Sequence, residues 1–205
     1  RETLESIKNQ DQEIKIECVF SDGGSKDATL NIINNFNQNN IKKVLLNNQI
    51  GMSKALNEGF RNSNGKYLTY LNSDDKLAAQ TLKVVKENFE NNSKINWIIG
   101  NCENFGKAKW VNKLVNNYKR ILLNKLNFSI LSMNNIIPQP SVYWRAEFFR
   151  DVGIFDEKLK YNMDYDLWLR MIKLSKPKIL NMNLSYFRRH SESLSHKNTL
   201  KQFYE

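Results

Sequence analysis

Two patterns of apolar residues alternate along the first half of the chain. Short apolar runs predict strands, and stretches in which apolar residues recur every three or four positions predict amphipathic helices. Because strands and helices take turns, the sequence predicts an α/β fold with a mostly parallel sheet that is flanked by helices on both faces. The predicted elements are the end of a helix at Thr3–Gln10, a strand at Ile14–Phe20, a helix after Asp27, a strand at Lys43–Leu46, a helix at Met52–Asn62, a strand at Tyr67–Leu71, a helix at Gln80–Phe89 and a strand at Trp97–Ile99.

The second half of the chain has a less regular pattern. The sequence shows no internal repeat and no linker that separates two domains, and it ends in a polar tail. The elements predicted here are broken helix at Trp110–Leu131, the entry to a strand at Pro138–Trp144, a short helix at Ala146–Val152, an amphipathic helix at Tyr165–Leu174 and a strand at Ile179–Phe187.

Length and composition are those of a globular domain. The chain has 205 residues, 40% of them apolar, with only 8 glycines and 3 prolines, which argues against disordered and fibrous proteins. No stretch approaches the roughly 20 apolar residues of a membrane-spanning helix, and we do not expect the polar start to be a signal peptide. Cys18 and Cys102 match no metal-binding spacing, which favours a reducing compartment and a cytoplasmic location.

The formal net charge is +10, from 31 basic and 21 acidic residues. A nucleic acid, an anionic membrane face or a phosphate-bearing substrate would each suit this charge, and solubility alone would also explain it. Since no aromatic-basic repeat or recognition helix is present, we expect no nucleic-acid partner. Peripheral contact with the inner face of a membrane stays open.

The first candidate site is the run Asn72-Ser73-Asp74-Asp75, which follows a predicted strand. Adjacent carboxylates are costly unless they are solvated, capped or neutralised by a cation. Mg²⁺ and Mn²⁺ commonly lie between one or two carboxylates and the phosphates of a substrate. The run taken alone fits equally an Asx turn and cap at the start of a helix.

A second polar turn, Ser21-Asp22-Gly23-Gly24-Ser25, also follows a predicted strand. Ligands of parallel sheets bind beyond the carboxyl ends of the strands, so both turns should lie at the ligand-binding edge. Asp22 could accept hydrogen bonds from a base or a ribose, although a tight turn explains the run as well. The phosphate-binding P-loop and the Gly-x-Gly-x-x-Gly fingerprint of dinucleotide-binding proteins are both absent.

Two further groups of polar residues could take part in catalysis. Asp164 and Asp166 stand at the start of a predicted helix, where one could be a general base and the other a cap, or both could be caps. Arg188 and His190, in a basic run, could neutralise a leaving diphosphate or bind a metal, or they could form a solvated turn.

Several runs together form an ordered series. In this order they resemble the family 2 glycosyltransferases with the GT-A fold, and the resemblance extends from about Glu2 to about Ser195. It implies one domain over residues 1–195, with a nucleotide-binding half over about 1–100, an acceptor half over about 101–195 and a tail at 196–205. The runs are Val19–Thr29, Gly51–Gly59, Asn64–Tyr67, Leu71–Asp75, Gln139–Arg145, Val152–Glu157, Met163–Arg170 and Phe187–His190.

The resemblance also implies roles for the candidate residues. Asp22 would contact the nucleoside of a nucleotide-sugar donor. Asn72, Asp74 and Asp75 match the acidic Asp-x-Asp run of the family, with Asn72 in place of its first Asp. Asp74, with His190 on a closing segment beside Arg188, would hold Mg²⁺ or Mn²⁺ at the diphosphate.

On the acceptor side, the resemblance implies that Asp164 is the catalytic base and that Gln139 and Trp144 line the site. The acceptor would be a saccharide or a lipid-linked sugar of the cell envelope, and the transfer would invert the anomeric centre. Members of the family begin with an apolar, central strand, and this sequence starts inside the helix that follows it. A nucleotidyltransferase or a non-catalytic nucleic-acid-binding module remains as the alternative.

Overall fold

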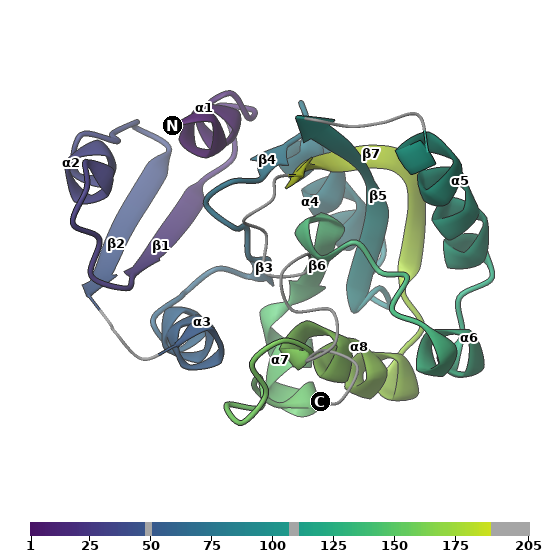
Figure 1. The fold of residues 1–205 in the computed structure, drawn as a ribbon. Helices are drawn as coiled ribbons and strands as arrows, with labels where there is room; N and C mark the ends of the chain where they lie inside the picture. Colours follow the sequence, from purple (N-terminus) through teal and green to yellow (C-terminus); the bar gives the residue numbers. More distant parts are fainter. Residues whose placement is uncertain (48–50, 107–110, 190–205) are drawn as a thin grey trace.

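The computed structural model describes residues 1–47, 51–106 and 111–189 of the chain. Helices and strands alternate through the first half as predicted (Figure 1). The elements are α1 (Glu2–Lys8), β1 (Ile16–Asp22), α2 (Thr29–Asn34), β2 (Ile41–Asn47), α3 (Met52–Arg61), β3 (Tyr67–Leu68), β4 (Lys76–Leu77), α4 (Thr81–Asn91), β5 (Trp97–Gly106), α5 (Val111–Asn124), α6 (Phe128–Met133), the 3₁₀ turn η1 (Gln139–Ser141), β6 (Val142–Arg145), α7 (Ala146–Val152), α8 (Met163–Leu174) and β7 (Lys178–Arg189).

The strands form two separate sheets. β1 and β2 make a parallel pair, and the other five strands follow the order β3-β6-β5-β7-β4. The two long pairings, β1 with β2 and β5 with β7, are parallel, whereas the antiparallel pairings of β3, β4 and β6 are only two or three residues long. The α/β class is therefore confirmed; the five-stranded sheet is mixed, and the expected parallel character holds for the two long pairings.

A single sheet is predicted from the sequence, and the structure instead divides it between β1 and β3. No backbone ladder joins these two strands in the described part of the chain, although α3 and α1 lie on either side of the division (Figure 1).

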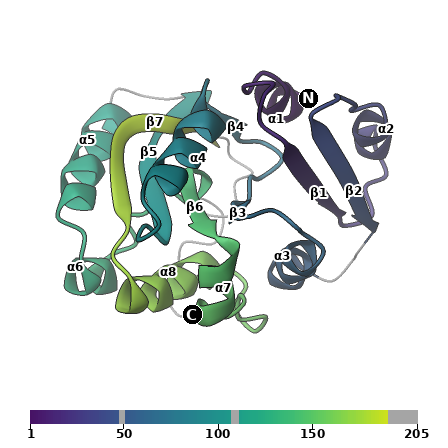
Figure 2. The same ribbon diagram turned by 180° about the vertical axis from the view of Figure 1, so that it is seen from behind.

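Helices cover the five-stranded sheet on both faces, and the side chains of β5 show how. Successive residues of a strand point to opposite faces. Trp97 and Ile99 pack into the cluster that α7 and α8 share, while Ile98 packs into a second cluster with Val85 and Phe89 of α4. Figure 2, seen from behind, shows α4 across the face opposite to α8.

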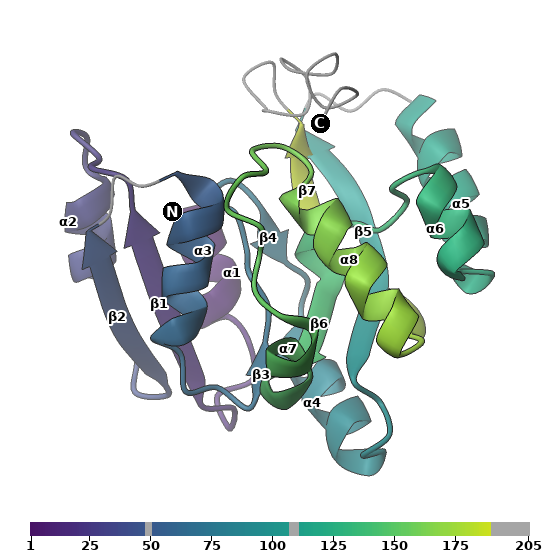
Figure 3. The same cartoon turned by 90° about the horizontal axis from the view of Figure 1, so that it is seen from below.

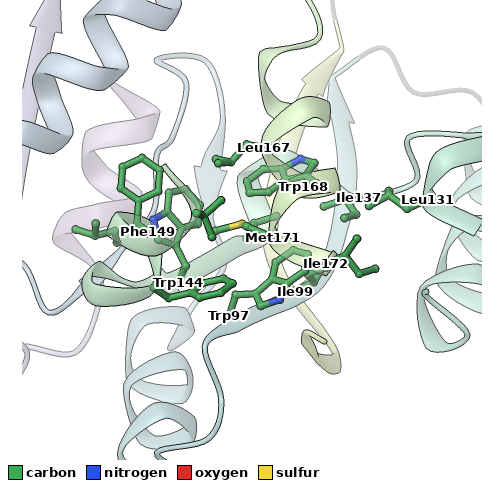
Figure 4. Close-up of a cluster of buried hydrophobic side chains, with 14 of the residues drawn as sticks. Trp97, Ile99, Leu131, Ile137, Trp144, Phe149, Leu167, Trp168, Met171 and Ile172 are labelled. Carbon is green, nitrogen blue, oxygen red and sulfur yellow. The ribbon is translucent and has the colours of Figure 1, made fainter. Parts of the chain in front are cut away.

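Three tryptophans form the centre of the larger cluster. The Trp97 and Trp168 rings stack with centroids 6.2 Å apart, and Trp144 meets Trp168 edge-on at 5.7 Å (Figure 4). On α8 the buried residues recur at helical spacing from Met163 to Ile172, so that one face of the helix packs on the sheet. Burial of each large side chain contributes about 1.5–3 kcal/mol, so this cluster holds α8 rigidly beneath the ligand-binding edge.

Most strands shift by one or two residues from the expected bounds, and β3 and β5 differ by more. β3 ends at Leu68 rather than Leu71, and β5 continues to Gly106 although its second half is polar. Polar residues are tolerated there because the β5 backbone pairs with β7 as far as Arg189, with register shifts between Gly100 and Cys102. β4 was not predicted, since two residues carry no periodic signal.

The boundary between halves that was expected near residue 100 falls within β5, and the five-stranded sheet takes strands from both sides of it. The proposed tail at 196–205 lies outside the described residues. Among the helices of the described segments, none has the length and apolar character needed to cross a bilayer.

The close approach of β5 and β7 generates a test of the fold. A Cβ on Gly100 would lie 2.3 Å from Cγ of the buried Leu184, so Gly100→Ala should destabilise the protein by about 1–3 kcal/mol. In Gly59→Ala the new Cβ would meet only Val19, at 3.9 Å, and α3 should gain up to about 1 kcal/mol. Urea unfolding measures both, and an unchanged midpoint for Gly100→Ala would contradict the packing.

Candidate active site

The candidate residues gather at one edge of the molecule. β1, β2, β5 and β7 point the same way, and α8 begins at the edge where they end (Figure 3). Asp22 is the last residue of β1, and Arg188 is next to last in β7. The structure thus supports the expectation that the polar turns share the carboxyl edge of the strands.

The Asp22 carboxylate shapes its own turn. Its Oδ2 accepts hydrogen bonds from the backbone N–H groups of Gly24 and Ser25, each at 2.9 Å, and its Oδ1 accepts from the Ser25 hydroxyl at 2.5 Å. These bonds, the Ser25 hydroxyl foremost, lower the pKa of Asp22 below its usual value. A positive φ of 91° at Gly24 closes the turn. Contact between Asp22 and a nucleoside remains a prediction.

In the acidic run, Asp75 is a fully buried carboxylate that holds the run in place. Its Oδ1 accepts the Arg188 backbone N–H at 2.9 Å, and its Oδ2 lies 3.4 Å from the Asn72 side-chain nitrogen. Burial raises the pKa of Asp75 to about 6. Because both oxygens are already engaged, Asp75 anchors the run. The role of Asp74 as a metal ligand remains a prediction.

Arg188 ties the acidic run to the N-terminal helix. Its Nε donates to the Asp74 carbonyl at 3.1 Å, and its guanidinium pairs with Glu2 of α1 at 2.9 Å. The Thr3 hydroxyl also donates to the Ser73 carbonyl, at 2.7 Å. The role of Arg188 at a diphosphate remains a prediction. In this structure its guanidinium bonds to the Asp74 carbonyl and to Glu2, so it links the acidic run to α1.

Gln139 and Trp144, expected on the acceptor side, have different surroundings. Gln139 bonds the Tyr70 carbonyl at 2.8 Å and the Asn72 side chain at 3.2 Å, which puts it beside the acidic run. Trp144 is 0% exposed and packs among Phe60, Phe149 and Trp168. The placement of Trp144 at the acceptor is therefore corrected: both faces of β6 are covered, and no surface of the ring is left for a ligand.

The structure separates the roles of Asp164 and Asp166. Asp166 forms an ion pair with Arg170 at 2.7 Å, and Arg170 in turn donates to the carbonyls of residues 152–154. Asp164 forms no such pair within the described residues; its Oδ1 accepts the Tyr165 N–H, at 2.7 Å. Desolvation raises the pKa of Asp164 to about 6, as expected of a general base that works near neutral pH.

Tyr70 connects the two acidic groups. Its side chain is buried and packs edge-on against Phe155 with centroids 5.7 Å apart. Burial raises the pKa of Tyr70 well above its usual value, and the negative charges of Asp164 and Asp75 raise it further. Both carboxylates are thus near enough to Tyr70 for their charges to raise the pKa of this one phenol.

Two polar residues of α3, Asn57 and Ser53, hold the segment that leads to Asp164. Neither was predicted from the sequence as a functional residue. Asn57 is fully buried; its side chain donates to the Phe155 carbonyl and accepts the Phe155 N–H, both at 2.9 Å. The Ser53 hydroxyl donates to the Leu159 carbonyl at 2.7 Å. Both residues lie in the Gly51–Gly59 run, which is the signal that could have identified them.

The metal prediction is tested in part by the residues present. In the described segments no group of three or more His, Cys, Asp or Glu side chains could hold an ion, and His190 lies outside those segments. Asp74 and the amide oxygen of Asn72 remain. This donor set fits Mg²⁺ or Mn²⁺, which take few protein ligands and complete their shell with phosphate oxygens and water.

Comparison with known proteins agrees with this geometry. An uncharacterized glycosyltransferase of Rickettsia felis is 29% identical over 203 residues, which is 96% of this chain and 33% of that protein. The poly-beta-1,6-N-acetyl-D-glucosamine synthase of Staphylococcus epidermidis is 27% identical over 159 residues, or 76% of this chain and 38% of that protein. The chain spans from 25% to 55% of the length of the first relatives it matches.

Solved structures show the same fold. S. aureus TarS in complex with UDP-GlcNAc superposes with a TM-score of 0.70 at 18% identity, over 94% of this chain and 55% of that one. Mannosyltransferase PcManGT from Pyrobaculum calidifontis, in complex with GDP-Man and Mn²⁺, gives 0.67 at 16% identity, over 95% and 54%. The GT-A fold implied by the resemblance is thus confirmed. Because the model of Glycosyl transferase family 2 matches residues 1–152, the chain belongs to that family.

Proposed function

We propose that this chain carries the catalytic domain of a glycosyltransferase that moves a sugar from a nucleotide-diphosphate donor to an acceptor hydroxyl with inversion. The observation that carries the proposal is the position of three groups at one edge of the molecule: Asp22 at the end of β1, the acidic run bonded to the end of β7, and Asp164 in the first turn of α8. Family membership supports the reaction type. UDP-GlcNAc and GDP-mannose are the sugar donors to test first, because similar structures hold them.

On the side of the sugar donor, Asp74 and Asn72 Oδ1 would hold Mg²⁺ or Mn²⁺, which neutralises the charge of a leaving diphosphate when bound. Asp75 keeps this pair in position through its bonds to Arg188 and Asn72. The Asp22 turn ends β1 at the same edge and would receive the nucleoside. A mutation of Asp74 should therefore weaken nucleotide binding only when the metal is present.

On the acceptor side, Asp164 would take the proton of the attacking hydroxyl. A carboxyl with a pKa of about 6 is ionised at pH 7 and is more basic than an ordinary aspartate. The attack displaces the nucleoside diphosphate from the opposite side of the anomeric carbon, so one step breaks the bond to the diphosphate and forms the new glycosidic bond. Similarity to a poly-N-acetylglucosamine synthase supports a saccharide acceptor of the cell envelope.

Asp164→Asn tests the base. The amide keeps the shape but cannot take a proton, so kcat should fall by about 10²–10⁴-fold, while binding of the sugar donor is retained. Chromatography of released UDP or GDP measures turnover, and release of pyrophosphate instead would indicate a nucleotidyltransferase.

Asp166→Asn is the matched control on the same helix turn. Loss of its partly exposed ion pair should cost under about 1 kcal/mol and leave turnover near wild type. Equal rates for wild type and Asp164→Asn would refute the assignment of the base.

The pH dependence of turnover follows from the raised pKa values. Asp164 and Asp75 both ionise near pH 6, so kcat/KM should rise through about pH 6 and level off roughly one pH unit above it. The carboxyl protons of Asp164 and Asp75 are bound more tightly in the folded state than in the unfolded state. Protonation of these two groups therefore stabilises the fold fully below about pH 4, and this stabilisation is lost as the pH rises through about 6. Asp164→Asn should accordingly raise stability at pH 7 by on the order of 1 kcal/mol. Initial rates and thermal melts across pH 4–8 check both statements.

We also propose peripheral contact with the inner face of a membrane, through a surface that we call the apolar-basic surface. It comprises large apolar side chains on the neighbouring helices α5 and α6 and at the end of α8, with lysines beside them. Lys173 Nζ lies 4.9 Å from the Phe128 ring. Exposed apolar side chains next to lysines favour an anionic bilayer surface. The residues are Tyr118, Ile121, Lys125, Phe128, Met133, Lys173 and Leu174.

Flotation with lipid vesicles tests this surface. The protein should bind vesicles that contain phosphatidylglycerol, bind much less to pure phosphatidylcholine, and be released by high salt. The double substitution Ile121→Glu and Met133→Glu should abolish most binding, because each places a charge where an apolar side chain would contact the bilayer. Ile154→Glu, at an exposed apolar position after α7, is the control and should bind as wild type. No difference between the two lipids would overturn the proposal.

A further inference from the structure

The Asn72 side chain, at the first position of the acidic run, has an orientation that the surrounding backbone determines. A backbone carbonyl only accepts hydrogen bonds. The Tyr70 carbonyl lies 2.8 Å from the Gln139 side chain, so the Gln139 nitrogen must face it. The Gln139 Oε1 then faces Asn72. Because this oxygen is an acceptor, Asn72 must direct its side-chain nitrogen toward it, and the two atoms lie 3.2 Å apart.

A second acceptor confirms this orientation independently. Asp75 Oδ2 lies 3.4 Å from the same Asn72 nitrogen, while Asp75 Oδ1 is occupied by the Arg188 N–H. The amide nitrogen of Asn72 therefore lies between two oxygens, one from Gln139 and one from Asp75. Across the described part of the chain, no hydrogen bond reaches Asn72 Oδ1.

This arrangement explains why an amide suits position 72. A carboxylate there would face the oxygens of Gln139 and Asp75 with no hydrogen between them. If Gln139 turned round to donate to it, the Gln139 oxygen would face the Tyr70 carbonyl instead. Asn72 and Gln139 therefore form a matched pair, although 67 residues separate them along the chain.

We propose that Gln139 is a positioning residue that binds the nitrogen of Asn72 and thereby presents Asn72 Oδ1 as an oxygen ligand for the cation that would hold the diphosphate of the sugar donor. This inference rests on the proposed function. Gln139 acts only through Asn72 and does not itself touch the ligand. It therefore belongs to the site of the sugar donor and not to the acceptor side where the sequence placed it.

A double-mutant cycle in the affinity for Mn²⁺ and UDP tests the proposal, with GDP in place of UDP if the wild type binds only GDP. Gln139→Leu should weaken Mn²⁺ binding by about tenfold or more, as loss of a residue that orients a ligand commonly does. In the Asn72→Ala background, which has already lost Oδ1, the same Gln139→Leu change should have no further effect. Calorimetry and the Mn²⁺ electron paramagnetic resonance signal measure these affinities without requiring turnover.

Thr69→Val provides the matched control. The Thr69 hydroxyl donates to the Val142 carbonyl at 2.8 Å, so it joins the same two segments as Gln139 without touching Asn72. Its loss should leave Mn²⁺ affinity unchanged, and thermal melts confirm that every variant is folded. Equal weakening by Gln139→Leu with and without Asn72 would show a merely structural role and overturn the inference alone. A wild type that binds neither UDP nor GDP with Mn²⁺ would overturn the proposed function as well.

Discussion

The candidate site depends on one buried carboxylate, that of Asp75. A charge without water is unfavourable unless hydrogen bonds replace its hydration, and here the Arg188 N–H and the Asn72 amide supply them. These bonds join the acidic run to the end of β7. The flanking strands β3 and β4 are only two residues long, so their own pairing could not fix the run. Asp75 thus gives a loop the rigidity that a cation site requires.

Asp164 is positioned in a comparable way, by α8 and α3. α8 packs through its apolar face onto the tryptophan cluster, and the segment before it is held by Asn57 and Ser53 of α3. α3 lies beside β1, outside the five-stranded sheet (Figure 1). The hydrogen bonds of α3 therefore connect the part of the chain that carries Asp22 to the part that carries Asp164.

The sequence predicted most of the elements and the edge at which polar residues gather, because periodicity and strand ends are local signals. It could not assign Trp144, since β6 is covered on both faces and shows no alternation between core and surface. The partner of Gln139 depends on a contact between distant segments, which no local pattern encodes. Asp74 and Asp75 are neighbours of the same residue type, and only the hydrogen bonds to Asp75 distinguish the anchor from the candidate ligand.

Asp75 and Asp164 share a pKa of about 6 for the same reason, desolvation, yet their surroundings differ. Asp75 faces hydrogen-bond donors on both oxygens, so an amide there would turn an N–H group toward another N–H group. Asp164 accepts hydrogen bonds only from backbone N–H groups of its own helix turn and forms no ion pair within the described residues. A desolvated carboxylate with so few partners costs stability and joins no separate parts of the fold. A stability cost without a matching structural contact is expected where a group is kept for its reactivity. This difference is the physical reason to propose Asp164 as the base and Asp75 as the anchor of the acidic run.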